Sequence, residues 1–127
     1  MKSFVPIQHS SKMSIFKINV LKTMMYCGVL WGLYHPDHHG WAIHKIDHEH
    51  IFPFWLNSVQ ALQYAKVHWP NYKPRKINAD DFQNFLLPTL KRFEVVPALC
   101  HKKDKLLKIS ISHMQLLFFK HHLVTAN

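Results

Sequence analysis

Residues 29–55 read VLWGLYHPDHHGWAIHKIDHEHIFPFW, and this stretch decides the fold class. Two apolar and aromatic runs, 29–34 and 41–46, flank a segment with Pro, Asp and Gly, which is typical of a β-hairpin. A third run, 51–55, follows a short polar segment and predicts a further strand. Because Pro53 lacks a backbone donor, we expect this strand to lie at a sheet edge or a bulge.

Helical periodicity appears on both sides of this stretch. Apolar residues recur at steps of three and four from Met13 to Cys27, and Gly28 directly after them is a common helix end. Downstream, Asn57 predicts the N-cap of a short helix. Residues 67–77, which contain two prolines, are expected to form a long connection.

The last third of the chain again mixes helix and strand. Asn78 is a favourable N-cap and predicts a second helix, which Pro88 is expected to kink or split. Two strands are expected at 94–100 and 106–111. A final helix is expected to begin at Ser112.

The expected order of elements is helix, three strands, two helices, two strands and helix. Short turns join neighbouring strands, so we expect a mostly antiparallel sheet of about five strands with helices packed on one face. The chain has 127 residues, of which 48% are hydrophobic, and this suits a folded domain rather than disorder. The sequence therefore predicts a single α+β domain over residues 11–127, preceded by a loose leader at 1–10.

Basic residues dominate the charged side chains. Sixteen Lys and Arg stand against seven Asp and Glu, which gives a formal net charge of +9. Twelve His add a reserve of positive charge in acid. Such a surface favours acidic partners, whether nucleic acid, anionic lipid or an acidic protein.

The sequence predicts a reduced cytoplasmic protein. Cys27 and Cys100 are the only cysteines, and both lie in apolar surroundings that favour buried thiols over a disulfide framework. The longest uncharged apolar run, 23–36, is shorter than the ~18 residues of a membrane span. Lysines interrupt any hydrophobic core of a signal peptide near the N-terminus.

Tryptophan-centred motifs and further landmarks follow one another in a fixed order. They are Leu30-Trp31-Gly32-Leu33, Gly40-Trp41-Ala42, Pro53-Phe54-Trp55, Ala61, Ala65, Trp69, Tyr72, Pro74, Ile77, Phe82, Phe85 and Leu87-Pro88-x-Leu90. This series, over about residues 13–100, resembles the bacterial family called domain of unknown function 2750. The resemblance implies a small single-domain α+β protein with no established activity. The chain departs from that family's pattern in its basic charge and its His-crowded hairpin turn.

Histidines crowd the predicted hairpin. Six of the twelve fall within sixteen residues: His35, His38, His39, His44, His48 and His50. On an extended stretch His48 and His50 would project to one side, and His44 on the neighbouring strand could meet them. Three converging imidazoles can bind Zn²⁺ or Ni²⁺. The alternatives are adventitious metal binding and a solvated His-rich turn, and the sequence as a whole implies no cofactor.

Basic residues form three further clusters, at 73–76, 91–92 and 102–108. The first is flanked by aromatic rings, and the first and last supply the residues expected to bind a partner. The residues expected to bind a partner are Trp69, Tyr72, Lys73, Arg75, Lys76, Lys102, Lys103 and Lys105. Basic side chains interleaved with rings can contact a phosphate backbone and its bases. No helix-turn-helix, zinc-finger or ribonucleoprotein signature accompanies them. An acidic protein partner, nucleic acid and a simply solvated basic face therefore stay open.

The sequence contains no recognisable catalytic motif. It has no Gly-rich phosphate loop and no Gly-x-Ser-x-Gly elbow. Cys100 and His101 are adjacent, but neighbours on a strand point to opposite faces and do not form a dyad. The sequence thus favours a non-enzymatic interaction or regulatory domain with a basic surface suited to an acidic partner. The alternative is a nucleic-acid-binding or metal-binding accessory protein, and an exposed edge at Pro53 would suit strand addition.

Overall fold

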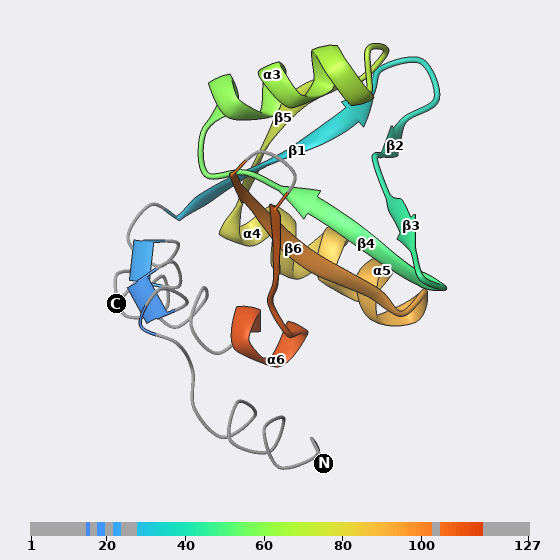
Figure 1. Cartoon of the computed structure of the whole chain (residues 1–127). Coiled ribbons are helices and arrows are strands. Elements are labelled where there is room, and N and C mark those ends of the chain that lie inside the picture. The colour runs from blue at the N-terminus through green and yellow to red at the C-terminus, as the bar shows by residue number, and fades with distance from the viewer. Residues whose placement is uncertain (1–14, 16–17, 20–21, 24–27, 103–104, 116–127) are drawn as a thin grey trace.

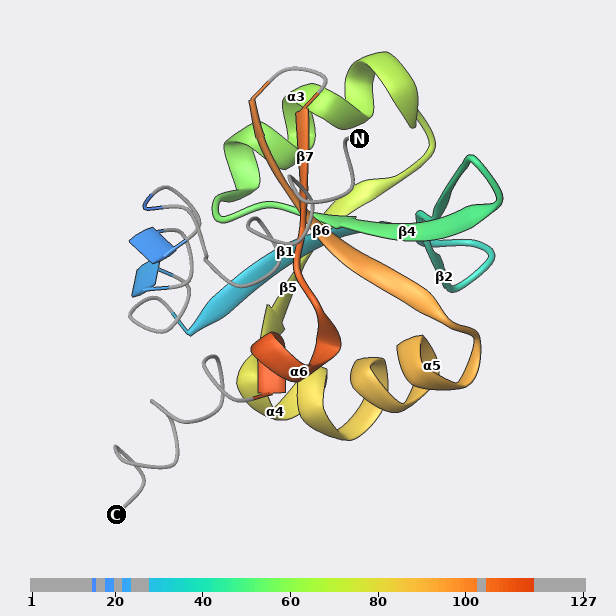
Figure 2. The same cartoon turned by 60° about the horizontal axis from the view of Figure 1, so that its bottom comes forward.

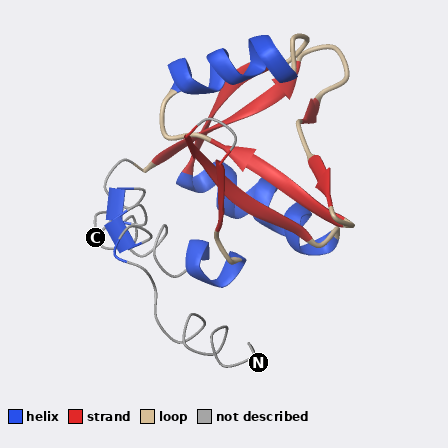
Figure 3. Cartoon of the chain, in the orientation of Figure 1, coloured by secondary structure: helices blue, strands red, loops and turns tan. Residues whose placement is uncertain are grey.

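The structure is a computed structural model. It describes residues 15, 18–19, 22–23, 28–102 and 105–115, without the side chains of 101–102. Strands occupy the centre of the described part and helices lie around them (Figures 1 and 3). The predicted leader and most of the predicted first helix lie outside the described residues. The α+β class predicted from the sequence is confirmed.

Three strands form the first sheet, antiparallel throughout and in the order β2-β1-β5. They are β1 (Val29–His35), β2 (Gly40–Trp41) and β5 (Lys73–Asn78). The predicted hairpin is confirmed only at β2, because residues 44–46 of its predicted second arm pair with a strand of the other sheet. β5 shows that the prediction of a long connection at 67–77 was wrong. Pro74 lies opposite Leu33, whose carbonyl bonds to Ala42 on the other side of β1. The nitrogen of Pro74 therefore points away from β1, toward the outer edge of the sheet. No strand there needs a backbone N–H from this position.

Four strands form the second sheet, in the order β3-β4-β6-β7. They are β3 (His44–Ile46), β4 (Glu49–Phe54), β6 (Val95–Lys102) and β7 (Lys105–Lys108). β4 and β6 are parallel, and the other pairs are antiparallel. The described residues thus hold two sheets, one of them mixed, where a single mostly antiparallel sheet was expected. A parallel pair needs a long crossover, and the segment between β4 and β6, which contains helices and the strand β5, supplies it.

A tryptophan pair joins the two sheets. The backbone N–H groups of Trp31 and Trp55 each donate to the carbonyl of the other at 2.8 Å. Pro53 lies in the inner strand β4, opposite Ala98 of β6, so the prediction of an edge strand open to strand addition was wrong. Alternation along β4 turns the nitrogen of Pro53 to the same side as that of Trp55. On that side β4 has no β3 residue opposite Pro53, because the pairing with β3 stops at Ile51. The missing N–H of Pro53 therefore breaks no hydrogen bond between strands.

Helices connect the strands. They are α3 (Ser58–His68), α4 (Ala79–Asp81), the π-helical segment η1 (Phe82–Leu86), α5 (Leu87–Arg92) and α6 (Ile111–His113). The predicted caps at Asn57 and Asn78 are confirmed, because each side-chain oxygen accepts a backbone N–H at 2.8 Å. Ser110 rather than Ser112 caps α6, since its hydroxyl accepts the N–H of His113. None of the helices in the described part of the chain is long and apolar enough to cross a membrane.

Pro88 splits the second predicted helix, as expected. It is the second residue of α5 and follows the π-helical turn. A proline has no N–H to bond the carbonyl four residues back. In the wider turn before it, the N–H of Leu87 bonds the carbonyl of Phe82, five residues back. The split helix keeps Phe82, Leu86 and Leu90 buried on one side.

Helices cover both faces of the strands, where one face was expected (Figures 1 and 2). Side chains alternate along each strand, so neighbouring positions belong to different cores. The core on the side of η1 and α5, here the α5-side core, contains Leu30, Phe52, Phe54, Phe82, Leu90 and Leu99. The core beneath α3, here the α3-side core, contains Leu33, Ala42, Trp55, Ala61, Ala65 and Cys100.

Candidate functional site

The His-rich hairpin does not assemble the three-imidazole site predicted from the sequence. The register pairs His44 with Ile51, the neighbour of His50, so the His44 and His50 imidazoles leave opposite faces of the sheet. His48 lies in the turn between them with a φ of 68°. Across the described residues, no three His, Cys, Asp or Glu side chains lie close enough together to hold a metal ion.

His44 lies instead against helix α3. Its Nε2 atom is 3.0 Å from the hydroxyl of Tyr64, and its ring meets that of Trp69 edge-on at 5.2 Å. Burial lowers the pKa of His44 below its usual value of 6.5, and the nearby His68 imidazole lowers this pKa further. The fold therefore favours a neutral imidazole at this position.

His35 closes the turn that follows β1. Its Nδ1 atom accepts the backbone N–H groups of Asp37 and His38, at 3.2 and 3.1 Å. Its ring stands edge-on to that of Tyr72 at 5.0 Å. Sequence reasoning missed this structural role. A side chain with a hydrogen-bond acceptor directly before a Pro-Asp turn is the signal that could have indicated it.

Trp69 and Tyr72, predicted to bind a partner, belong to an aromatic cluster at the end of α3. Their rings meet edge-on at 4.9 Å, and both side chains are half-buried. The indole Nε1 atom of Trp69 is buried and has no hydrogen-bond partner among the described residues. These rings connect α3 to the hairpin, so they offer less surface for stacking than the sequence suggested.

The basic residues of β5 lie on an outer strand of the first sheet. Lys73 and Arg75 project from one face and Lys76 from the other, and all three are exposed. The guanidinium carbon of Arg75 lies 4.4 Å from the centre of the Tyr34 ring and 5.9 Å from that of Trp41. Cation–π contact of this kind positions the guanidinium and leaves its N–H groups available to a partner.

A glycine makes room for the rings beneath Arg75. A Cβ atom at position 32 would come within 2.8 Å of the Trp41 ring and 3.1 Å of the Phe52 ring. Trp41 also meets Tyr34 edge-on at 5.0 Å. The missing side chain of Gly32 therefore allows Tyr34 and Trp41 to form the aromatic shelf on which Arg75 rests.

The predicted basic cluster at 102–105 lies on a different sheet. Lys105 begins β7, the outer strand of the second sheet, and its side chain is exposed. The side chain of Lys102 and the whole of Lys103 lie outside the described residues. The structure therefore does not bring the two clusters onto one strand.

The cations of β5 are not neutralised within the described part of the fold. The one ion pair found there joins Lys108 of β7 to Glu49 of β4. Lys73, Arg75 and Lys76 have no carboxylate within ion-pair distance among the described residues. Their positive charge is therefore free to attract an acidic partner.

Cys100 is poorly suited to nucleophilic chemistry. Burial raises the pKa of its thiol to about 12, so very little thiolate forms at neutral pH. The prediction of a buried thiol is confirmed for Cys100, while Cys27 lies outside the described residues.

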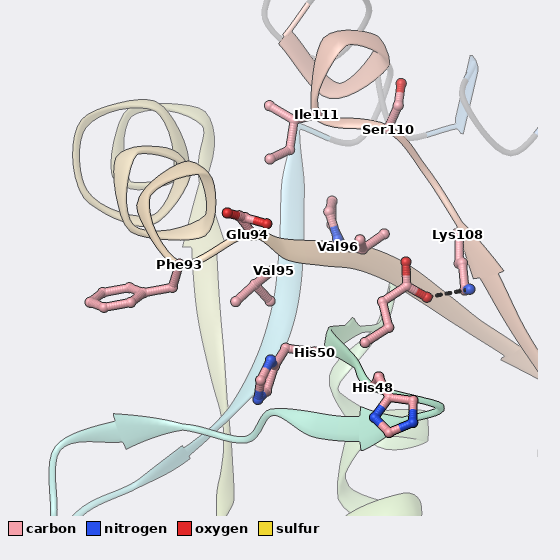
Figure 4. A pocket seen from close by; sticks show the side chains of 11 residues that line it. His48, His50, Phe93, Glu94, Val95, Val96, Lys108, Ser110 and Ile111 are labelled. Carbon is pink, nitrogen blue, oxygen red and sulfur yellow. Dashed lines mark hydrogen bonds and ion pairs between the residues drawn. The ribbon is translucent and has the colours of Figure 1, made fainter.

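A pocket of about 720 Å³ lies where β4, β6 and β7 diverge (Figure 4). Its polar lining comes from His48, His50 and Glu94 and from the Lys108–Glu49 pair. The start of β6 and the first residue of α6 supply an apolar lining. His48 and His50, predicted as metal ligands, lie here without His44. Sequence reasoning missed the pocket, because its walls come from segments far apart in the chain.

The residues that build both sheets match a known family model. That model is described as "Protein of unknown function (DUF2750)", and it matches residues 19–117. The chain belongs to this family. The resemblance drawn from the tryptophan motifs is therefore confirmed, and the DUF2750 match runs from before β1 to beyond α6. No curated protein compared with the chain matches it.

Proposed function

We propose that this DUF2750 chain is a non-enzymatic interaction domain whose strand β5 binds an acidic partner. The observation that carries the proposal is Arg75, which rests on the aromatic shelf and has no ion pair among the described residues. A guanidinium already held by stacking loses little side-chain freedom when it bonds a carboxylate or a phosphate. Lys73 and Lys76 on the same strand add charge on both faces.

The composition of β5 favours contact through side chains rather than through strand addition. Pro74 removes a donor from the outer edge of this strand. Lysines on an edge strand also oppose pairing with the strand of another chain. We therefore expect the partner to place acidic groups against Lys73, Arg75 and Lys76 without extending the sheet.

The test compares two variants that remove the same amount of positive charge. One variant changes Lys73, Arg75 and Lys76 to Gln, and the control changes Lys66, Lys91 and Arg92 to Gln; all six side chains are exposed. The probe is a fluorescent poly-glutamate peptide at low salt. We expect the β5 variant to bind about tenfold more weakly than the wild type and the control to bind within about twofold. Equal weakening of both variants would contradict a site on β5, because only net charge would then matter.

A single-stranded oligonucleotide of similar charge serves as the second probe. Cations that attract carboxylates also attract phosphates, and both contacts weaken as salt rises. If only the oligonucleotide bound, the partner of β5 would be a nucleic acid rather than an acidic protein. Binding of neither probe at low salt would overturn the proposed function.

A further inference from the structure

In the pocket between β4, β6 and β7, the start of β6 pairs with β4 on one side and has no strand partner on the other among the described residues. β7 pairs with β6 from Ala98 onward, and the last bond on this side runs from the N–H of Ile109 to the carbonyl of Pro97. Alternation along β6 turns the N–H and the carbonyl of Val95 to the same side as the carbonyl of Pro97. No backbone group of the described residues bonds to them.

The side chain of Val95 packs into the core, whereas its backbone N–H and carbonyl have no backbone partner on the β7 side among the described residues. Its exposed fraction is 8%, and it belongs to the α5-side core. Backbone N–H and carbonyl groups in folded proteins are nearly always paired with protein, water or a ligand, so this position suits a ligand with a donor and an acceptor at strand spacing. The backbone of an extended peptide supplies both groups, and its residue opposite Val95 would form two hydrogen bonds.

The negative charge of Glu94 beside Val95 favours a peptide with a cationic side chain. Glu49 is already paired with Lys108, whereas Glu94 is exposed and has no ion pair in the described part of the chain. Glu94 adopts a φ of 53° in the turn before β6, next to Val95 in the chain. Figure 4 shows its carboxylate on the side of β6 that faces Ile111. A cationic side chain with an apolar stem suits this setting.

We propose that this pocket binds an extended peptide segment of another protein, paired with Val95 through its backbone and with a Lys or Arg side chain against Glu94. The site is independent of the proposed contact on β5, because β5 belongs to the other sheet. The peptide would continue the line of β7 along β6, at the place where β7 turns away toward α6.

The experiment adds acetyl-Val-Val-Lys-amide to isotope-labelled protein, so that the central valine pairs with Val95 and the next residue turns its lysine to the face of Glu94. It follows the amide resonance of Val95. We expect this resonance to shift downfield, with a dissociation constant in roughly the millimolar range. Two comparison peptides test the two contacts separately. One is N-methylated at its central valine and lacks the backbone donor, and the other has glutamate in place of lysine. Each is expected to bind at least about fivefold more weakly.

Variants of the protein test the same contacts from the other side. Glu94→Gln is expected to remove the preference for the lysine peptide over the glutamate peptide while the Val95 resonance still shifts. Asp37→Asn removes another exposed carboxylate, at the β1–β2 turn, and is expected to bind like the wild type. Equal binding of all three peptides, or of none, would overturn the proposal. So would a Val95 amide that exchanges slowly with solvent before any peptide is added, because the chain itself would then satisfy it.

Discussion

The two faces of the strands are packed with different kinds of side chain. The α5-side core is built from aliphatic residues and phenylalanines, and no polar or charged side chain is buried in the described residues. The α3-side core contains mostly small residues besides Leu33 and Trp55, and its partly buried rim includes Tyr64 and Trp69, which His44 contacts. The α5 side therefore contributes stability without any titration, whereas the α3 side couples packing to the protonation of His44.

The largest expected effect is on the α5 side. Phe82 is 0% exposed and Phe85, three residues later in the same π-helical segment, is 72% exposed. We expect Phe82→Ala to lower the free energy of unfolding by about 3–5 kcal/mol and Phe85→Ala to lower it by less than about 0.5 kcal/mol. Urea unfolding followed by tryptophan fluorescence measures both. Similar losses in the two variants would mean that this face does not hold the main core.

A medium effect is expected where β1 meets the aromatic shelf. Gly32→Ala places a Cβ atom 2.8 Å from the Trp41 ring, so the indole must move. We expect a loss of about 1–3 kcal/mol and a changed emission spectrum of the tryptophans. Gly40→Ala is the control, since the nearest atom to its new Cβ would be 4.0 Å away. A neutral Gly32→Ala variant would show that the shelf does not depend on this close approach.

The smallest expected effect is the pH dependence of the α3 side. Because the pKa of His44 is lowered in the folded state, the unfolded chain takes up a proton first as the pH falls through 6.5. Stability from a neutral His44 is therefore complete above pH 6.5 and is lost as the pH falls from there toward the folded pKa. We expect His44→Asn to make the urea midpoint less dependent on pH across this window. An unchanged dependence would assign the acid sensitivity to other groups.

Local sequence patterns correctly predicted the structural features that depend only on residues close together in the chain. The caps at Asn57 and Asn78 and the break at Pro88 need only side chains within a few residues, and all three are confirmed. The strand β5 was missed because its proline and its basic residues resemble a loop. Its pairing with β1 joins residues 29–35 to 73–78, and no local pattern reports such a contact.

The candidate sites show the same division. Sequence spacing predicted that His44, His48 and His50 lie close together. The register of β3 against β4 instead places His44 against α3 and His50 in the pocket. The basic residues of β5 were found from composition, whereas the aromatic shelf under Arg75 needed the meeting of β1, β2 and β5.

Composition and short-range pattern by themselves determined that this chain forms an α+β fold with excess positive charge and capped helices. Those properties follow from side-chain periodicity, backbone donors and charge counts within a few residues of each other. Only the tertiary structure decided that helices cover both faces, that Arg75 rests on Tyr34 and Trp41, and that Val95 has no partner on the β7 side among the described residues. Strand order and register decide these features, because they bring together groups that are distant in the chain.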